Sequence, residues 1–182
     1  NFHLSHVMGG VVRGAAMLPA AVGVGSVHPL LCIMAQGLVL RETNYKEADK
    51  ILTVLTREGG KRTVKARGCR RKNSPLAASA QLLAWSDMTL FAYRDRLTLN
   101  EAEALELFWG VRADVEKLAL ASYFAEVTEA VAEEGRPDPA LLSLALNSLY
   151  ALDKLQRPLP LVKAAFELKL LCVAGYEPLL DA

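Results

Sequence analysis

Residues 50–68 read KILTVLTREGGKRTVKARG. The first part is rich in β-branched residues, and the pair Gly59-Gly60 separates it from a second strand-like run. Two glycines at such a point favour a β-hairpin, because a tight turn between strands needs positive φ angles. On the second run Val64 and Ala66 fall on one face and most of the cations on the other. The stretch therefore predicts a hairpin with a basic outer surface.

Further strand-like runs flank this hairpin. With it, they give five short strands in about 65 residues, at 36–41, 50–57, 61–68, 81–93 and 97–100. A polar stretch of 69–75 between the third and fourth predicts a loop or small helix. An open five-stranded sheet would leave exposed edges, whereas a small closed barrel of the OB type removes them. We expect that barrel.

From Glu101 onward the pattern indicates helices. Glu101, Glu103 and Glu106 are interpreted as a solvated first helical turn. Apolar residues then recur at helical spacing, and proline- and glycine-containing segments end each run. Asp138 is predicted to cap one helix, with Pro139 at its first position. The predicted fold class is α+β, an N-terminal OB barrel followed by an all-α part.

Phe108 and Trp109 lie where these two parts meet, and we expect them to seal the barrel against the helices. The predicted domains are 34–100 for the barrel and 101–182 for the helices. Residues 1–33 carry one charge, Arg13, and all three histidines, and are interpreted as a non-native or disordered upstream extension. The uncharged segment 14–40 leaves a membrane or signal segment open, although prolines and glycines interrupt it.

The net charge of +1 conceals an asymmetry. From Ala35 to Arg96 there are thirteen Lys and Arg against six Asp and Glu, whereas from Leu97 to Ala182 there are seven against fourteen. Such a division favours a polyanion-binding barrel beside an acidic part with another role. Two solvated surfaces of opposite sign are the alternative.

The strongest functional signal is a basic run within residues 61–72. It contains Lys61, Arg62, Lys65, Arg67, Arg70, Arg71 and Lys72. No acidic residue lies between Glu58 and Asp87. A row of cations on a strand and its following loop suits a nucleic-acid backbone, which releases counterions when it binds. A solubilising surface remains the alternative.

Aromatic side chains beside cations could add base stacking. Tyr45 and Tyr93 each stand at a predicted strand end next to a cation, and we expect them to stack on bases. Trp85 and Phe91 are expected to fill the barrel core. No array of base-reading groups is evident, so binding should tolerate any sequence.

Enzyme chemistry finds little support. No histidine lies beyond His28, and Gly59-Gly60-Lys61-Arg62 lacks the spacing and the Ser or Thr of a phosphate-binding P-loop. Cys32, Cys69 and Cys172 form no CxxC pair, so no zinc site or disulfide framework is visible. We expect a non-enzymatic cytoplasmic protein, with Cys172 as a small core residue.

Seven segments together form a recognisable family pattern: residues 37–41, 45–52, 55–61, 66–71, 118–123, 166–171 and 175–178. In these segments the chain resembles the bacterial RecO family of DNA repair proteins. The resemblance runs in order from Met34 to Ala182. It implies an OB fold with a helical domain, binding of single- and double-stranded DNA, annealing of complementary strands, and loading of RecA together with RecR. It also implies association with the nucleoid.

The resemblance further implies docking of the acidic, apolar C-terminal tail of single-strand-binding protein on the helical domain. Six cations could receive that tail: Arg112, Lys117, Lys154, Arg157, Lys163 and Lys169. Members of the family continue into a four-cysteine zinc module, which is expected after Ala182. No cofactor is expected within the 182 residues. An RNA-binding barrel and a protein-interaction adaptor remain the rival functions.

Overall fold

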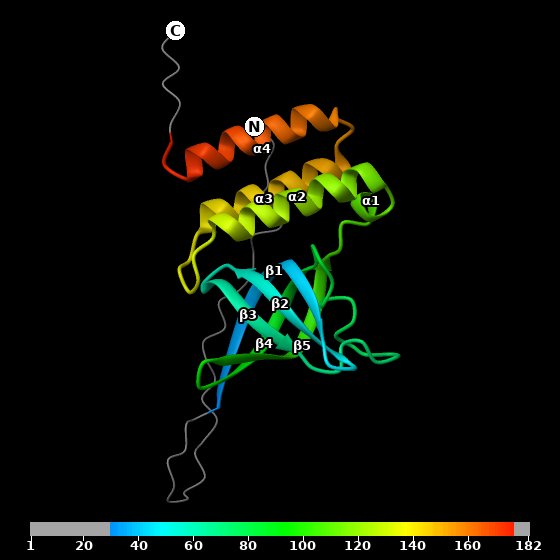
Figure 1. Ribbon diagram of the computed structural model, residues 1–182, viewed down its shortest axis with the longest axis vertical. Helices are drawn as coiled ribbons and strands as arrows, with labels where there is room; N and C mark the ends of the chain where they lie inside the picture. The colour runs from blue at the N-terminus through cyan, green and yellow to red at the C-terminus, as the bar shows by residue number, and fades with distance from the viewer. Residues whose placement is uncertain (1–29, 177–182) are drawn as a thin grey trace, which may run out of the picture.

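A computed structural model describes residues 30–176 of the chain. It has a five-stranded barrel at one end and a layer of helices at the other (Figure 1). The strands are β1 Leu31–Tyr45, β2 Asp49–Thr56, β3 Gly60–Ala66, β4 Trp85–Tyr93 and β5 Arg96–Glu106. The helices are α1 Trp109–Arg112, α2 Val115–Val131, α3 Pro139–Lys154 and α4 Leu159–Val173. The predicted α+β class is confirmed.

The sheet closes in the order β1-β2-β3-β5-β4. β1 is long enough to pair with two neighbours: Leu31–Leu38 pairs with β4, and Gly37–Tyr45 pairs with β2. Gly37 lies where β1 passes from pairing with β4 to pairing with β2. A Cβ on Gly37 would lie 2.4 Å from Val54 Cγ1, so glycine lets β1 approach β2 this closely. The barrel is closed by a short parallel pairing of β3 with β5, from Val64↔Leu97 to Ala66↔Leu99, which reduces the sheet edge left open to another chain.

Three boundaries differ from the sequence prediction. The fourth strand begins at Trp85 rather than at residue 81, because residues 81–83 form a turn. Residues 31–33, assigned to the upstream extension, are the first residues of β1 and pair with β4. Residues 1–29 lie outside the described part of the chain. At the third boundary, β5 continues to Glu106, so the interpretation of Glu101, Glu103 and Glu106 as a helical turn is wrong. Pairing with β4 holds this segment extended.

Two hydrophobic clusters form the core, and one of them extends from the barrel into the helices. Val54, Val64 and Leu90 are among the residues that fill the barrel interior. A second cluster joins Leu38 and Leu55 at the barrel end to the helical side chains. The barrel and the helices therefore share buried apolar surface.

The junction between them is tightly held. Phe108 is buried, as expected, and has a left-handed backbone with a φ of 51°. The Glu106 carboxylate accepts hydrogen bonds from the Phe108 and Leu107 amides at 2.8 and 3.0 Å. Trp109, by contrast, is 65% exposed and does not seal the junction as predicted.

Helix caps follow the sequence closely. Asp138 caps α3 by accepting from the Leu141 amide at 2.9 Å, and Pro139 is the first helical residue, as predicted.

In the helical layer, the rings of Phe124 and Phe166 stack with centroids 4.1 Å apart. Cys172 is exposed on α4, so its assignment to the core is wrong.

Candidate nucleic-acid interface

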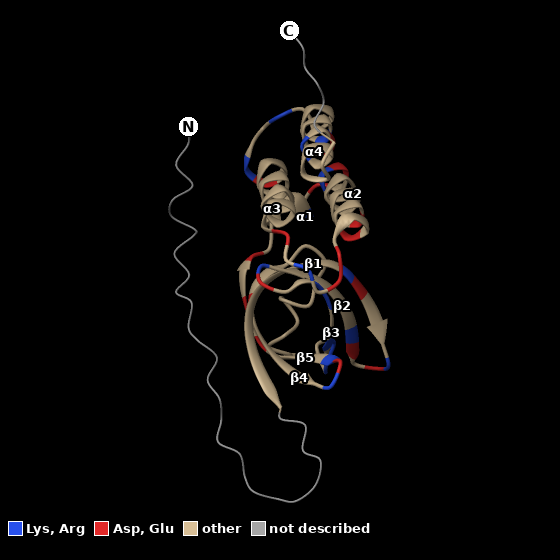
Figure 2. Cartoon of the chain, turned by 90° about the vertical axis from the view of Figure 1, so that its left-hand side faces the viewer, with Lys and Arg blue, Asp and Glu red and all other residues tan. Residues whose placement is uncertain are grey.

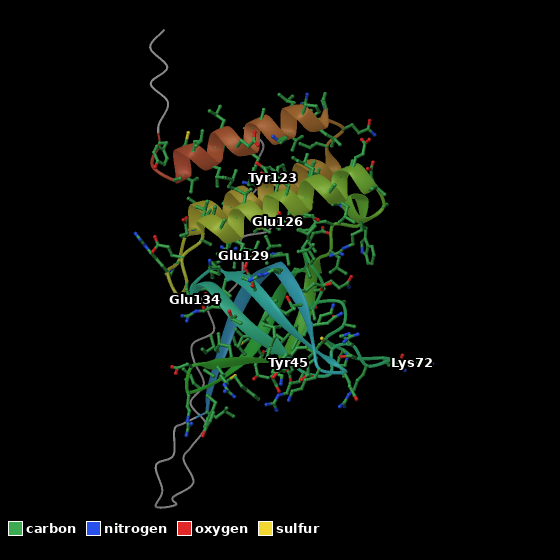
Figure 3. The ribbon with its side chains drawn as sticks, in the orientation of Figure 1. Tyr45, Lys72, Tyr123, Glu126, Glu129 and Glu134 are labelled. Atoms are coloured by element: carbon green, nitrogen blue, oxygen red, sulfur yellow. The ribbon has the colours of Figure 1, made fainter. Side chains whose placement is uncertain are left out.

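The basic run of residues 61–72 divides between two ends of the barrel. β3 begins at Gly60 beside the helices and runs away from them (Figure 1). Lys61 and Arg62 therefore lie near the junction, whereas the cations from Lys65 to Lys72 lie at the far end. Figure 3 shows Tyr45 in the lower part of the barrel, Lys72 on a loop that projects from its side, and Glu129 and Glu134 at the junction with the helices.

Lys61 is engaged by the helical layer. Its Nζ donates to the Glu129 carbonyl oxygen at 2.9 Å, near the C-terminal end of α2. Its backbone also pairs with the α2–α3 loop, through Lys61 N to Glu133 O at 3.3 Å and Gly135 N to Lys61 O at 3.0 Å. Arg62 is half-buried, and its guanidinium lies beside Gly135. The structure thus places these two predicted DNA contacts in a structural joint, which we call the locked end.

Tyr45 lies at the opposite end, with Lys65 of the basic run beside its ring. Tyr45 closes β1 and is 41% exposed. Two lysines lie over its ring, with Lys65 Nζ 4.9 Å and Lys46 Nζ 5.4 Å from the centroid. Cation–π attraction holds such ammonium groups near the ring. The structure therefore brings a stacking surface and phosphate-binding charges together.

A polar network fixes the loop of residues 67–84 that follows β3. At the start of the loop, the Gly68 amide donates a hydrogen bond to the Asp49 carboxylate at 2.8 Å. The same carboxylate forms an ion pair with Lys65 Nζ at 3.1 Å. The Gly68 amide and Lys65, in that order, hold the pKa of Asp49 below its usual value. The Arg70 amide also donates to the Ala48 carbonyl at 3.0 Å. The basic part of the loop is therefore anchored to the β1–β2 turn.

The far side of the loop is anchored to the barrel and to α1. Lys50 Nζ donates to the Ala80 carbonyl at 3.1 Å and pairs with Glu42 at 2.8 Å. The Glu42 carboxylate accepts from the Leu82 amide at 3.1 Å, and Arg112 Nη2 donates to the Leu82 carbonyl at 2.6 Å. The Arg112 side chain thus holds this loop in place. Burial lowers the pKa of its guanidinium.

The tip of this anchored loop is a cluster of exposed cations. It comprises Arg67, Arg70, Arg71 and Lys72. Among residues 30–176 none of these four forms an ion pair with a carboxylate; Arg70 Nη1 makes a hydrogen bond of 3.4 Å to the Lys46 carbonyl. We call this cluster, with Tyr45, Lys46 and Lys65, the open end. Unpaired charges on a fixed loop form a surface suited to phosphates.

Tyr93 occupies a different hairpin. It ends β4, is 47% exposed, and has Arg94 Cζ 5.4 Å from its ring centroid. Between the two tyrosines lies the outer face of β3 and β5, where Lys65 is in register with Thr98. In OB folds the face of the second and third strands and the β1–β2 and β4–β5 loops commonly bind oligonucleotides. Tyr45 directly precedes the first of these loops and Tyr93 the second. The structure keeps Tyr93 as a second aromatic–cation pair, separate from the Tyr45 cluster.

Sequence reasoning missed three residues at these sites. Lys46 and Arg94 each follow a predicted tyrosine directly, so adjacency to Tyr45 and Tyr93 was a usable signal. Asp49 was missed because nothing in the sequence shows that its carboxylate reaches the Gly68 amide. Trp85 is buried as predicted. Phe91 is only half-buried, on the face of β4 opposite the buried Leu90, so its assignment to the barrel core is wrong.

The helical layer carries a groove between α3 and α4 with a volume of about 600 Å³. Its walls are mainly apolar and include Leu144, Leu161 and Phe166. Of the six cations predicted to receive an acidic tail, only Arg157 and Lys169 line this groove. Lys154 and Lys163 are instead paired with Asp153 and Glu167 at 2.6 Å each.

Within residues 30–176 no group of three or more His, Cys, Asp or Glu side chains could hold a metal ion. None of the described helices is long and apolar enough to span a bilayer.

Comparison with known proteins identifies the family. The model of the recombination protein O N-terminal domain matches residues 33–108, and that of its C-terminal domain matches residues 112–182. A DNA repair protein RecO from Acetivibrio thermocellus is 40% identical over 147 residues, covering 80% of this chain and 58% of that protein. RecO of Alkaliphilus metalliredigens is 37% identical over 148 residues, covering 81% of this chain and 60% of that protein.

A third relative, RecO of Symbiobacterium thermophilum, is 40% identical over 147 residues, with 80% of this chain and 58% of that protein aligned. The chain thus spans about three fifths of the length of the relatives it matches. Both of its parts, the barrel and the helical layer, fall within the matched models. This chain belongs to the RecO family of DNA repair proteins.

Proposed function

We propose that the chain binds DNA through the open end and acts in recombinational DNA repair. The observation that carries this proposal is the cluster of exposed, unpaired cations on an anchored loop beside Tyr45. Because these groups match phosphates rather than base edges, binding should be tolerant of sequence and strongly dependent on salt. Tyr45 and Tyr93 would add stacking on unpaired bases.

The family membership supports a role beyond simple binding. We propose that the protein anneals complementary strands and helps to load RecA on single-stranded DNA together with RecR, without catalysing a reaction itself. Annealing requires two polyanions to be held close together, and a dense positive surface reduces their repulsion. Duplex and single-stranded DNA both present the phosphates that such a surface needs. The cytoplasm, in contact with the nucleoid, is the compartment this role implies.

Two rival functions make different predictions. An RNA-binding barrel would prefer RNA over DNA of the same sequence, and a protein adaptor would bind neither with a steep salt dependence. The test is fluorescence anisotropy of the 182-residue protein with labelled single-stranded DNA, duplex DNA and RNA across a salt series. We expect DNA binding whose affinity falls steeply as salt rises. Undetectable or salt-insensitive binding would contradict the proposal.

We also propose that the α3–α4 groove receives the C-terminal tail of single-strand-binding protein. Apolar walls with Arg157 and Lys169 at their border suit an acidic, apolar peptide. The test measures binding of a peptide with that tail sequence to the wild type and to the Arg157→Glu and Lys169→Glu variants. Lys163→Glu is the matched control, because Lys163 does not line the groove. Equal peptide affinity for all four proteins would contradict the assignment.

A zinc module after residue 182 remains a prediction from the family. The described cysteines lie apart, and Cys69 is buried in the barrel. Residues 30–176 therefore provide no ligand set for such a metal.

A further inference from the structure

An acidic residue stands in the middle of the open end. Asp49 begins β2, directly opposite Tyr45 at the end of β1. Its charge opposes the binding of any phosphate nearby. A surface built only for charge would be improved by its removal.

The contacts of Asp49 give it a different role. Its Oδ1 accepts from the Gly68 amide at 2.8 Å, and its Oδ2 pairs with Lys65 Nζ at 3.1 Å. That same Lys65 ammonium lies 4.9 Å from the Tyr45 ring centroid. One carboxylate therefore connects three parts of the open end: the stacking ring, the β3 cation and the start of the basic loop at Gly68.

We propose that Asp49 is a positioning residue for DNA binding, which holds Lys65 over Tyr45 and fixes the start of the basic loop. This inference rests on the proposed function. The free energy that a flexible lysine and loop would lose on ordering is reduced when they are already placed. The DNA affinity gained from this preorganisation exceeds the affinity lost to repulsion, because the Asp49 carboxylate is already ion-paired with Lys65.

The same turn contains a matched control. Glu47 lies two residues before Asp49, is exposed, and makes no ion pair among the described residues. Glu47→Gln and Asp49→Asn each remove one negative charge from the same turn. Only the second removes a contact to Lys65.

The test compares DNA affinities of these variants at one salt concentration, using a labelled single-stranded oligonucleotide. Glu47→Gln should tighten binding roughly twofold, because it removes repulsion alone. Asp49→Asn should weaken binding roughly threefold, because Lys65 is released. Asp49→Glu keeps the charge and should stay within about twofold of the wild type. Thermal unfolding of each variant shows that the folded protein is being compared.

A double-mutant cycle shows whether Asp49 acts through Lys65. In a Lys65→Gln background, Asp49→Asn should no longer weaken binding. Equal weakening in both backgrounds would overturn the inference, as would tightening by Asp49→Asn equal to that by Glu47→Gln. A wild-type protein that binds no DNA would instead overturn the proposed function, so the two failures are distinguishable.

Discussion

The locked end and the open end share one basic run of sequence but have different surroundings. At the locked end, Lys61 is held by the α2 carbonyl of Glu129 and by the backbone of the α2–α3 loop. At the open end, Arg67, Arg71 and Lys72 are exposed and free of ion pairs within the described part of the chain. The difference teaches that a run of cations can contain both structural joints and ligand contacts.

The locked end also depends on Gly60, the first residue of β3. Gly60 has a φ of 65°, and a Cβ there would lie 2.0 Å from the Arg136 carbonyl oxygen. Glycine is therefore required both for the turn and for the close approach of the α2–α3 loop. Arg41 on β1 adds an ion pair to Glu129 at 2.7 Å. These contacts hold the barrel against the helices. Figure 2 shows Asp and Glu residues at the lower end of α2, next to the barrel.

The largest expected effect is at the open end. Replacing Arg70, Arg71 and Lys72 with Ala should weaken DNA binding about 30-fold at moderate salt and reduce the salt slope by about two, because phosphate contacts are lost. Anisotropy titrations with oligonucleotides of several sequences measure both quantities.

The control for this triple variant replaces three cations of the helices, Lys117, Lys163 and Lys169, with Ala. That variant should bind DNA within about threefold of the wild type, since only long-range charge is lost. Comparable losses in the two triple variants would erase the distinction between the open end and the rest of the surface.

The next effect separates stability from binding. Lys61→Ala should lower the free energy of unfolding by about 1–2 kcal/mol, because the α2 carbonyl loses a charged donor. DNA affinity should change by less than about twofold. Urea unfolding and anisotropy measure the two quantities.

Arg67→Ala, on the same strand run, is the matched comparison. We expect it to weaken DNA binding and to leave the free energy of unfolding unchanged, since Arg67 is exposed and lacks an ion pair among described residues. The reverse pattern in the two variants would mean that the ends are wrongly assigned.

A smaller effect concerns stacking at the open end. Tyr45→Ala should weaken single-stranded DNA binding roughly fivefold, and Tyr45→Phe should nearly preserve it, because the ring rather than the hydroxyl contacts a base. Trp109→Ala is the control, since Trp109 is 65% exposed but lies on the helical side of the junction. Loss of binding on replacing Trp109 and not Tyr45 would relocate the stacking surface.

The smallest effect is a difference in acid response between the ends. The pKa of Asp49 in the folded protein is lowered by the Gly68 amide and by Lys65. Its stabilising contribution is therefore present above the unfolded-state pKa and is lost as pH falls through the still lower folded pKa. In an NMR titration the Gly68 amide should shift with a midpoint below the usual aspartate value.

The Gly135 amide, which donates to the Lys61 carbonyl at 3.0 Å, provides the comparison at the locked end. It has no carboxylate partner in its hydrogen bond, so it should not follow the same titration. A Gly68 midpoint at or above the ordinary aspartate pKa would show that the Asp49 contacts are absent in solution.

The sequence was sufficient for the architecture because its local signals agree. β2 and β3 form the predicted hairpin, although of the two glycines only Gly60 has a positive φ. Asp138 with Pro139 starts a helix where expected. The boundary at Glu101 was missed because Glu and Ala favour helices. The alternation of exposed Glu101 and Glu103 with half-buried Ala102 and Ala104 is nevertheless a period of two, typical of a strand.

The candidate site was only partly predictable. Tyr45 and the loop cations could be found from their neighbours in sequence. The division of the basic run could not be predicted from the sequence. Lys61 is hydrogen-bonded to residues about seventy positions later, in α2 and the α2–α3 loop. Only the tertiary fold shows which cations already have partners.

The most direct test of the central claim maps DNA contacts residue by residue. Isotope-labelled protein would be titrated with a short single-stranded oligonucleotide, and amide shifts followed by NMR. We predict the largest changes in residues 45–49 and 65–73, smaller ones in 93–96, and little change at Lys61, Arg62 or residues 133–136. Dominant changes at the locked end, with none around Tyr45 and Lys72, would contradict the account.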